Sequence, residues 1–204
     1  TPFITFFKMA PHQPIELSYV SKLRTEFYFP TPIYFYDAET RNDKNLVITE
    51  DTINWVMKVK EEVPNAGVSN VGGYQSPFNK DFKEIPYRSL EYVRKNLGGI
   101  PEFELQNWWI NISEKGSYNW HHTHPDSHLA LVWYLTPNYG TIRFDHPLQH
   151  VRNKLHRVTG LMDSINYTCN AGDILVFPAD LVHYVTAHEQ DTPRISISMN
   201  MRLI

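Results

Sequence analysis

Cysteine is almost absent from this sequence. Cys169 is the only one in 204 residues, so neither an intramolecular disulfide nor a cysteine-based zinc site is possible. The scarcity of cysteine fits a reducing compartment, and we therefore expect a cytoplasmic protein. Any metal ion must be held by histidine and carboxylate side chains.

Long runs of charge and of apolar residues are also missing. The chain has 19 basic and 22 acidic residues and a formal net charge of -3, with no block of either sign that would indicate a nucleic-acid or anionic membrane surface. Residues 1–11 are partly apolar, but they lack a basic leader and are shorter than the roughly 20 residues of a spanning helix. We expect neither a signal peptide nor an anchor there.

The length suits one domain over residues 1–204. Hydrophobic residues make up 42% and aromatic residues 14% of the chain, a composition typical of a packed globular protein. We expect an N-terminal arm at 1–30, a strand with supporting helices at 31–100 and a β core at 101–204. Nothing in the sequence indicates the oligomeric state.

The N-terminal part predicts one strand, two helices and a loop. Proline and β-favouring aromatics over Phe29–Ala38 indicate an edge strand. Apolar residues at helical spacing predict helices at about Asp51–Glu62 and Tyr87–Asn96, the second ending at a Gly-Gly pair. Between them, the glycines and polar residues of Ser69–Phe78 indicate a loop.

After residue 101 the pattern changes to short β segments separated by turns. Eight such segments are ELQNWWINIS, YNWHHTHP, HLALVWYLTP, GTIRFDHP, INYTC, DILVFP, LVHYVTAH and PRISISMNMRL. The sequence therefore predicts a mainly β protein with a helical layer (α+β), whose C-terminal half is a β-sandwich or barrel.

Histidines are concentrated at the start of this β half. His121, His122, His124 and His128 lie within eight positions, and His183 lies on a later strand. Regular alternation would place His122, His124 and Asp126 on one face of a strand, with Tyr118 and Trp120 preceding them on the same face. Two imidazoles and commonly one carboxylate hold iron(II) in oxygen-activating sites.

Two ligand registers are open, and both include His124. His122 with His124 gives an all-histidine pair, whereas His124 with Asp126 gives His-x-Asp and supplies a carboxylate. Pro125 argues against the second pair, because it would stiffen the segment between His124 and Asp126. A solvated turn with no ligands is the structural alternative, because His, Asp and Pro are common in turns.

The last strand alternates strictly. Arg194, Ser196, Ser198 and Asn200 share one face, and Ile195, Ile197, Met199 and Met201 share the other. If the polar face lines a barrel, Arg194 offers a guanidinium fork to a carboxylate, with Ser196 beside it. On an earlier segment Asn111 shares a face with Leu105, Asn107 and Trp109 if the strand is regular. Asn111 then either contacts a bound ligand or satisfies a buried hydrogen bond.

This order of motifs resembles the 2-oxoglutarate/iron(II) oxygenases, and more narrowly the prolyl-hydroxylase-like oxygenases of phages and marine bacteria. The stretches that carry the resemblance are FPTPIY (29–34), SNVGGYQS (69–76), WINISEKGSYNWHHTHPDS (109–127), VWYL (132–135), GDILVFPADLVHYV (172–185) and RISISMN (194–200). In that family a His-x-His pair occurs where other members have His-x-Asp, which favours the all-histidine register.

The resemblance implies a double-stranded β-helix, the cupin-like jelly roll, and an Fe(II) dioxygenase in a bacterial or phage-infected cytoplasm. It implies iron(II) at His122, His124 and His183, with Asp126 as the alternative to His122, and no catalytic side chain beyond the metal centre. It further implies 2-oxoglutarate at Arg194 and Ser196, with Asn111 and Tyr118 as weaker contacts. With O2 as cosubstrate, an unknown substrate, foremost peptidyl proline or another amino-acid residue, would be hydroxylated with release of succinate and CO2.

Two other functions compete with this interpretation. His122, His124, Asp126 and His128 nearly form the zinc motif of metallo-β-lactamase-type hydrolases, but Ser127 separates the Asp from the last His. A non-catalytic, cupin-like module that binds a metal or small ligand would use the same barrel. Arg194, eleven residues after His183, distinguishes the two functions, because a binding module does not need a carboxylate-binding arginine at that spacing.

Overall fold

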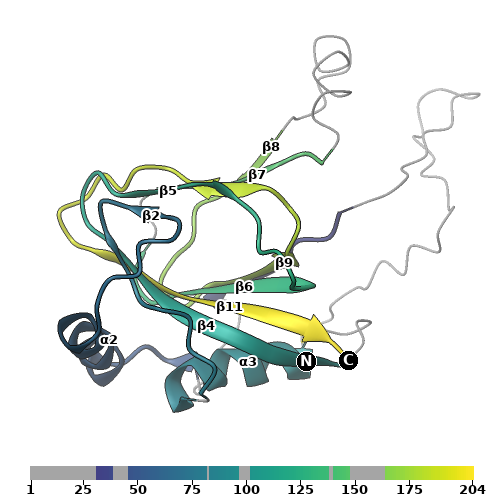
Figure 1. Ribbon diagram of the computed structural model, residues 1–204, viewed down its shortest axis with the longest axis horizontal. Coiled ribbons are helices and arrows are strands. Elements are labelled where there is room, and N and C mark those ends of the chain that lie inside the picture. Colours follow the sequence, from purple (N-terminus) through teal and green to yellow (C-terminus); the bar gives the residue numbers. More distant parts are fainter. Residues whose placement is uncertain (1–30, 39–45, 82, 97–101, 138–139, 148–163) are drawn as a thin grey trace, which may run out of the picture. The chain divides into compact units, whose positions relative to one another are not determined.

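The computed structural model describes residues 31–38, 46–81, 83–96, 102–137, 140–147 and 164–204. In these ranges the strands form two antiparallel sheets that face each other (Figure 1). The major sheet has the order β1 (Tyr34–Tyr36), β9 (Ile174–Pro178), β6 (Leu129–Tyr134), β11 (Arg194–Leu203), β4 (Phe103–Ser113) and β3 (Tyr74–Gln75). The minor sheet has the order β2 (Asn70–Val71), β5 (Tyr118–His122), β10 (His183–Val185), β7 (Ile142–Asp145) and β8 (Ser164–Tyr167).

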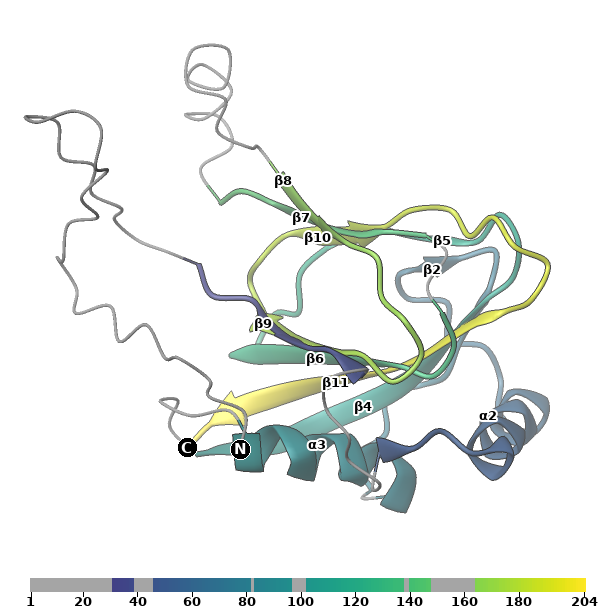
Figure 2. The same cartoon turned by 180° about the vertical axis from the view of Figure 1, so that it is seen from behind.

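From β4 to β11 the chain passes back and forth between the two sheets, with β7 and β8 both in the minor sheet. This is the double-stranded β-helix expected from the sequence, and each of the eight predicted β segments contains a strand. Strand β6 is buried at every residue, which explains its continuous apolar run. Strand β1 lies at the edge of the major sheet beside β9 (Figure 2), as expected from its proline-rich approach.

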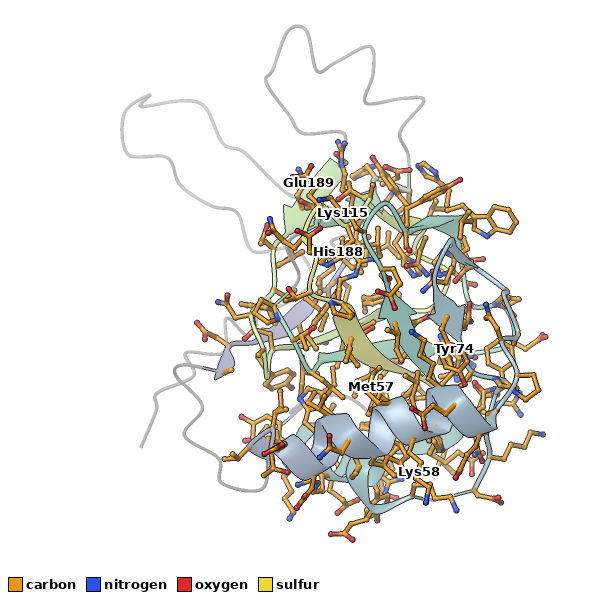
Figure 3. The ribbon with its side chains drawn as sticks, turned by 90° about the vertical axis from the view of Figure 1, so that its left-hand side faces the viewer. Met57, Lys58, Tyr74, Lys115, His188 and Glu189 are labelled. Atoms are coloured by element: carbon orange, nitrogen blue, oxygen red, sulfur yellow. The ribbon has the colours of Figure 1, made fainter. Side chains whose placement is uncertain are left out.

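Two helices pack on the outer face of the major sheet (Figure 1). Helix α2 (Glu50–Glu62) begins at Thr49, whose side chain accepts a hydrogen bond from the Thr52 N–H at 3.3 Å. It ends at Val63, directly before Pro64, as helices commonly do. Figure 3 shows Met57 on the side of α2 that faces the sheets and Lys58 on the opposite side.

The second helix, α3 (Glu84–Asn96), begins three residues before the predicted start at Tyr87. Pro86 lies in its first turn and is buried. Proline is tolerated there because the first N–H groups of a helix have no partner within the helix. The Gly-Gly pair expected to end this helix lies outside the described residues.

The two faces of the major sheet have separate cores. On the helical side, Ile195, Ile197, Met199 and Met201 of β11 pack with residues of α2 and α3. Between the sheets, a second cluster around Phe144 and Phe177 fills one part of the interior. The opposite, polar face of β11 points into the remaining interior space, which becomes a cavity.

The loop predicted over Ser69–Phe78 differs from the structure. It contains the short strands β2 and β3, which pair with β5 of the minor sheet and β4 of the major sheet. The segment therefore links the two sheets at one edge. The Gln75 side-chain oxygen holds the turn by accepting from the backbone N–H groups of Ser69 at 2.9 Å and Asn70 at 3.2 Å.

Ile33–Ile204 forms one compact unit. The arm expected at 1–30, and with it the segment considered as a signal or anchor, lies outside the described residues. Within the described ranges, no helix has the length and apolar character needed to cross a membrane. The single-domain interpretation of the whole chain stays a prediction.

The interior position of Cys169 gives a test of this core. The thiol is 1% exposed, and burial, with the negative charge of Asp173 nearby, raises its pKa to about 12. Because only the thiolate reacts, we expect thiol reagents at pH 8 to modify the native protein on the order of a thousandfold more slowly than the urea-unfolded chain. Native and unfolded rates within tenfold of each other would contradict this packing.

Candidate metal centre

Three histidines meet between the sheets. Strands β5 and β10 pair with His122 directly opposite His183. His124 follows the end of β5, where its backbone N–H donates to the Ala179 carbonyl at 2.9 Å. One ligand atom from each of His122, His124 and His183 lies within 4.8 Å of the others, so the described residues include a group able to hold one metal ion.

A β-bulge sets which residues of β5 face the interior. Asn119 lies opposite Val185 and His122 opposite His183, so three steps along β5 match two along β10. The extra residue reverses the alternation. Tyr118 and Trp120 are exposed instead of sharing the face of His122, and Asn119 lines the cavity beside it.

Each of the three imidazoles has its Nδ1 bonded to a carbonyl oxygen. The contacts are His122 with Trp120 O at 2.7 Å, His183 with Leu181 O at 2.8 Å, and His124 with Asn200 Oδ1 at 2.7 Å. A carbonyl oxygen only accepts, so each Nδ1 carries the proton and each Nε2 keeps a lone pair. This is the arrangement that orients histidine ligands in metal sites.

Burial keeps these imidazoles neutral. Desolvation lowers the pKa of His124 to about 4 and that of His183 well below its usual range, and repulsion among the histidines adds to both shifts. Desolvation also lowers the pKa of His122. The Trp109 ring against His124 and the Phe177 ring against His183 exclude water, with centroid separations of 5.4 and 4.8 Å. Neutral imidazole is the metal-binding form.

The other candidates in the histidine-rich run lie outside this group. Asp126 is exposed and adopts a φ of 67°, and its backbone oxygen accepts from Gln106 Nε2 at 3.0 Å. The ring of His128 accepts from the Leu203 N–H at 2.9 Å. His121 stacks on Tyr184.

The polar face of β11 forms the floor of the same cavity. Strand pairing sets Arg194 opposite Ser113 and Ser196 opposite Asn111. The Arg194 side chain donates to Ser113 Oγ at 2.9 Å and to Thr186 O at 3.4 Å, and burial lowers its pKa. Gly140 lies against the guanidinium, because a Cβ at that position would be 2.9 Å from Nη1.

The three histidines and the Arg194 guanidinium line the same cavity, so a single ligand can contact both. Arg194 bonds to the carbonyl of Thr186, which lies three residues beyond His183 in the chain. Three extended residues span roughly 10 Å. Because both groups line the same cavity, one ligand that has a metal-binding group and a carboxylate could contact both.

Further cavity residues were not identified from the sequence. Asn119 donates to Ser69 Oγ at 3.2 Å, and both line the cavity with Ser113, Ser198 and Tyr134. Asn119 was missed because the bulge is not visible in the sequence. The periodicity of β11 could have identified Ser198, which shares the face of Arg194 and Ser196.

Asn111 lines the cavity, with Nδ2 donating to Ser198 Oγ at 3.1 Å and Oδ1 buried without a hydrogen-bond partner. Leu105 differs from expectation. A bulge between Asn200 and Met201 turns Leu105 away from the face of Asn111 and onto the helical core. Tyr118 is 41% exposed and lies outside the cavity lining.

The residues present fit an iron(II) ion. Three neutral imidazole nitrogens in a buried pocket form a triangular donor set of the kind that suits iron and other first-row metals. Among the described residues that line the cavity there is no carboxylate and no cysteine. The described lining thus offers no negative charge to balance a divalent ion, and a bound carboxylate ligand would supply one.

Comparison with known proteins agrees with this chemistry. Residues 107–200 match the model of a family described as "Putative 2OG-Fe(II) oxygenase". The match confirms the superfamily recognised from the motifs. Among curated proteins, none is similar enough in sequence to match.

Solved structures show the same fold. A prolyl-4-hydroxylase from Pseudomonas putida is 14% identical, with a TM-score of 0.55 over 85% of this chain and 94% of that one. The viral collagen prolyl hydroxylase vCPH from Paramecium Bursaria Chlorella virus-1 is 14% identical, with a TM-score of 0.55 over 84% and 96%. HygX from Streptomyces hygroscopicus, solved with nickel and 2-oxoglutarate, is 10% identical, with a TM-score of 0.59 over 85% and 83%. These likenesses confirm the fold class.

The bond between Ser113 and the buried Arg194 predicts a stability effect. Ser113→Ala removes the oxygen that accepts from Nη2, so we expect the free energy of unfolding in urea to fall by about 1.5–3 kcal/mol, as for a bond to a charged group. Ser164→Ala is the matched control, because Ser164 accepts from Arg143 Nη2 at 3.0 Å in a half-buried position. The control is expected to cost below about 1 kcal/mol. Equal losses would contradict the larger contribution expected for the bond to the buried guanidinium.

Proposed function

We propose that this chain, whose residues 107–200 match the family model described as "Putative 2OG-Fe(II) oxygenase", is an iron(II)- and 2-oxoglutarate-dependent dioxygenase that hydroxylates its substrate. One observation carries the proposal. A single cavity is lined by three neutral imidazoles and by a buried guanidinium. A metal ion and a dicarboxylate are the ligands that these two groups recognise.

In the proposed site, His122, His124 and His183 hold the metal through Nε2. When bound, iron(II) supplies the oxidation in which one atom of O2 enters 2-oxoglutarate, giving succinate and CO2, and the other enters a substrate C–H bond as a hydroxyl. Because the three histidines would supply only three donor atoms, the ion could also take donors from 2-oxoglutarate and O2. Aromatic packing around the histidines excludes water from this face.

Arg194 and Ser196 are proposed to bind the distal carboxylate of 2-oxoglutarate. Ser113 and the Thr186 carbonyl hold the guanidinium in place, so little side-chain freedom is lost on binding. The free atom of Asn111 is an acceptor, Oδ1, whereas a carboxylate needs a donor. Asn111 therefore contacts the cosubstrate only after rotation of its amide, and otherwise accepts from water or substrate. No cosubstrate contact is assigned to Tyr118.

The proposed substrate is a peptidyl proline or another amino-acid residue. Support comes from the motif resemblance, and two of the similar structures are prolyl hydroxylases by their own descriptions. The proposed location is the cytoplasm of a bacterium or of a phage-infected cell, which fits a chain with one buried cysteine.

The competing functions have less support. A hydrolase of the metallo-β-lactamase type needs Asp126 and His128 beside the other ligands, and both side chains lie outside the histidine group. A binding module on the same fold leaves Arg194 unexplained, since its burial costs desolvation that a carboxylate ligand would offset.

Anaerobic titration with iron(II) and 2-oxoglutarate tests the proposed function. We expect wild type to develop the visible metal-to-ligand charge-transfer band of a chelated 2-oxoacid. His183→Ala should abolish the band, because a ligand is lost. Arg194→Ala should keep it but require at least about tenfold more 2-oxoglutarate, since a charge-assisted contact of roughly 1.5–3 kcal/mol is removed. Tight zinc binding with no band in wild type would contradict the oxygenase assignment.

The two ligand registers make opposite predictions. Asp126 is exposed and separate from the histidine group, so Asp126→Ala should leave the iron(II) affinity within about twofold, well inside the range of a remote change. His122→Ala should weaken it by roughly 100-fold or more, given that even the residues behind a ligand commonly contribute 10- to 100-fold. The reverse pattern in equilibrium dialysis would assign the His-x-Asp register.

A further inference from the structure

We propose that Asn200 and Asn107 form a relay that selects the metal-binding tautomer of His124. The inference rests on the proposed function, because it assigns a positioning role toward the metal ion. His124 is 6% exposed and Asn200 is 8% exposed. His124 Nδ1 lies 2.7 Å from Asn200 Oδ1, and Asn200 Nδ2 donates to Asn107 Oδ1 at 3.0 Å.

Strand pairing holds the three residues in this order. Asn200 of β11 lies opposite Asn107 of β4, so the two amides share the inward face of the major sheet. His124 reaches the same face from the segment after β5, which is fixed by the bond from its N–H to Ala179. The relay therefore links the two sheets through side chains alone.

Each member of the relay has two states. A neutral imidazole carries its proton on Nδ1 or on Nε2, and a carboxamide presents either its oxygen or its NH2 group. If the Asn200 amide were reversed, Nδ2 would donate to His124 Nδ1, and the ring proton would move to Nε2. That tautomer has no lone pair facing the cavity and cannot bind a metal ion.

The bond to Asn107 favours one of these states. The Asn107 Oδ1 accepts from Asn200 Nδ2, and the Asn200 oxygen then faces His124. The ring proton is then held on Nδ1 and the lone pair on Nε2. His124 and Asn200 are buried and Asn107 is half-buried. An unmatched donor or acceptor at the His124 end of the relay is therefore costly.

His124 differs from the other two candidate ligands in what its Nδ1 bonds to. His122 and His183 bond to backbone carbonyls two residues earlier, Trp120 O and Leu181 O. A backbone carbonyl only accepts and cannot exchange roles, so those tautomers follow from the fold. The tautomer of His124 alone depends on side chains, and a single substitution can change it.

The test compares two variants of Asn200 that match it in size. Asn200→Leu removes the acceptor, and Asn200→Asp keeps an acceptor while removing the donor. Asn166→Leu, at an exposed position of β8, is the matched control. Cobalt(II) affinity is measured at pH 8 from the visible absorption of the bound ion. In the metal-free protein, 15N NMR of the imidazole identifies which nitrogen of His124 carries the proton.

We expect Asn200→Leu to weaken cobalt(II) binding roughly 10- to 100-fold, the usual range for a residue that orients a ligand. The NMR signal of His124 should then show the Nε2-H form. Asn200→Asp should keep the Nδ1-H form and bind cobalt(II) at least as well as wild type, and Asn166→Leu should match wild type in both measurements.

Substitutions of Asn107, the next residue of the relay, test the same proposal. Asn107→Asp keeps the acceptor for Asn200 Nδ2, so the tautomer and the cobalt(II) affinity should be preserved. Asn107→Leu removes that acceptor and lets the Asn200 amide take both orientations. We then expect a mixture of His124 tautomers and a smaller loss of affinity than in Asn200→Leu.

Two results would overturn the relay. One is a Nδ1-H tautomer and wild-type cobalt(II) affinity in Asn200→Leu. The other is equal loss in Asn200→Asp and Asn200→Leu, which would mean that only packing matters. Failure of wild type to bind cobalt(II) would instead refute the proposed metal site, and the tautomer in the metal-free protein would still decide the relay.

Discussion

The two-sided burial of β11 is the constraint on which the rest of the structure depends. This strand pairs along both of its edges, with β4 and with β6. One of its faces is sealed by the helices, and the other carries Arg194, Ser196 and Asn200 into the interior. A slip of one residue would exchange the faces, placing the guanidinium in an apolar core and removing both the proposed carboxylate contact and the support of His124.

The features that could be predicted from the sequence are those that depend on strict local periodicity. Strand β11 alternates without interruption, so both of its faces could be assigned, and the segments of the β half could be located from their turns. Residues of β5 were assigned less well, because the bulge that brings Asn119 and His122 to the same side is a property of the pairing with β10. A bulge beside Asn200 likewise reversed Leu105. Such irregularities depend on partner strands, which a single sequence does not reveal.

The candidate metal ligands could be identified from their spacing in the sequence, but the protonation and orientation of their imidazoles could not. His122, His124 and His183 were proposed together, with Asp126 as an alternative. The structure brings the three histidines together and leaves Asp126 at the surface. Their neutrality comes from aromatic rings contributed by distant strands, and their orientation comes from carbonyl oxygens on three separate segments. The aromatic rings and the Asn200 amide are long-range features, whereas the carbonyls of Trp120 and Leu181 lie two residues from their histidines. The histidine-rich run by itself is equally consistent with a solvated turn.

The lining of the cavity has a consequence for how a site of the proposed kind assembles. It contains a guanidinium and three imidazoles, and no carboxylate among its described members. A divalent cation entering alone would meet a positive charge in a medium of low polarity, and a dianion entering alone would satisfy only one end of the cavity. In the proposed site, metal and cosubstrate would act as each other's counter-ion, with the protein contributing the geometry and the ligand contributing negative charge.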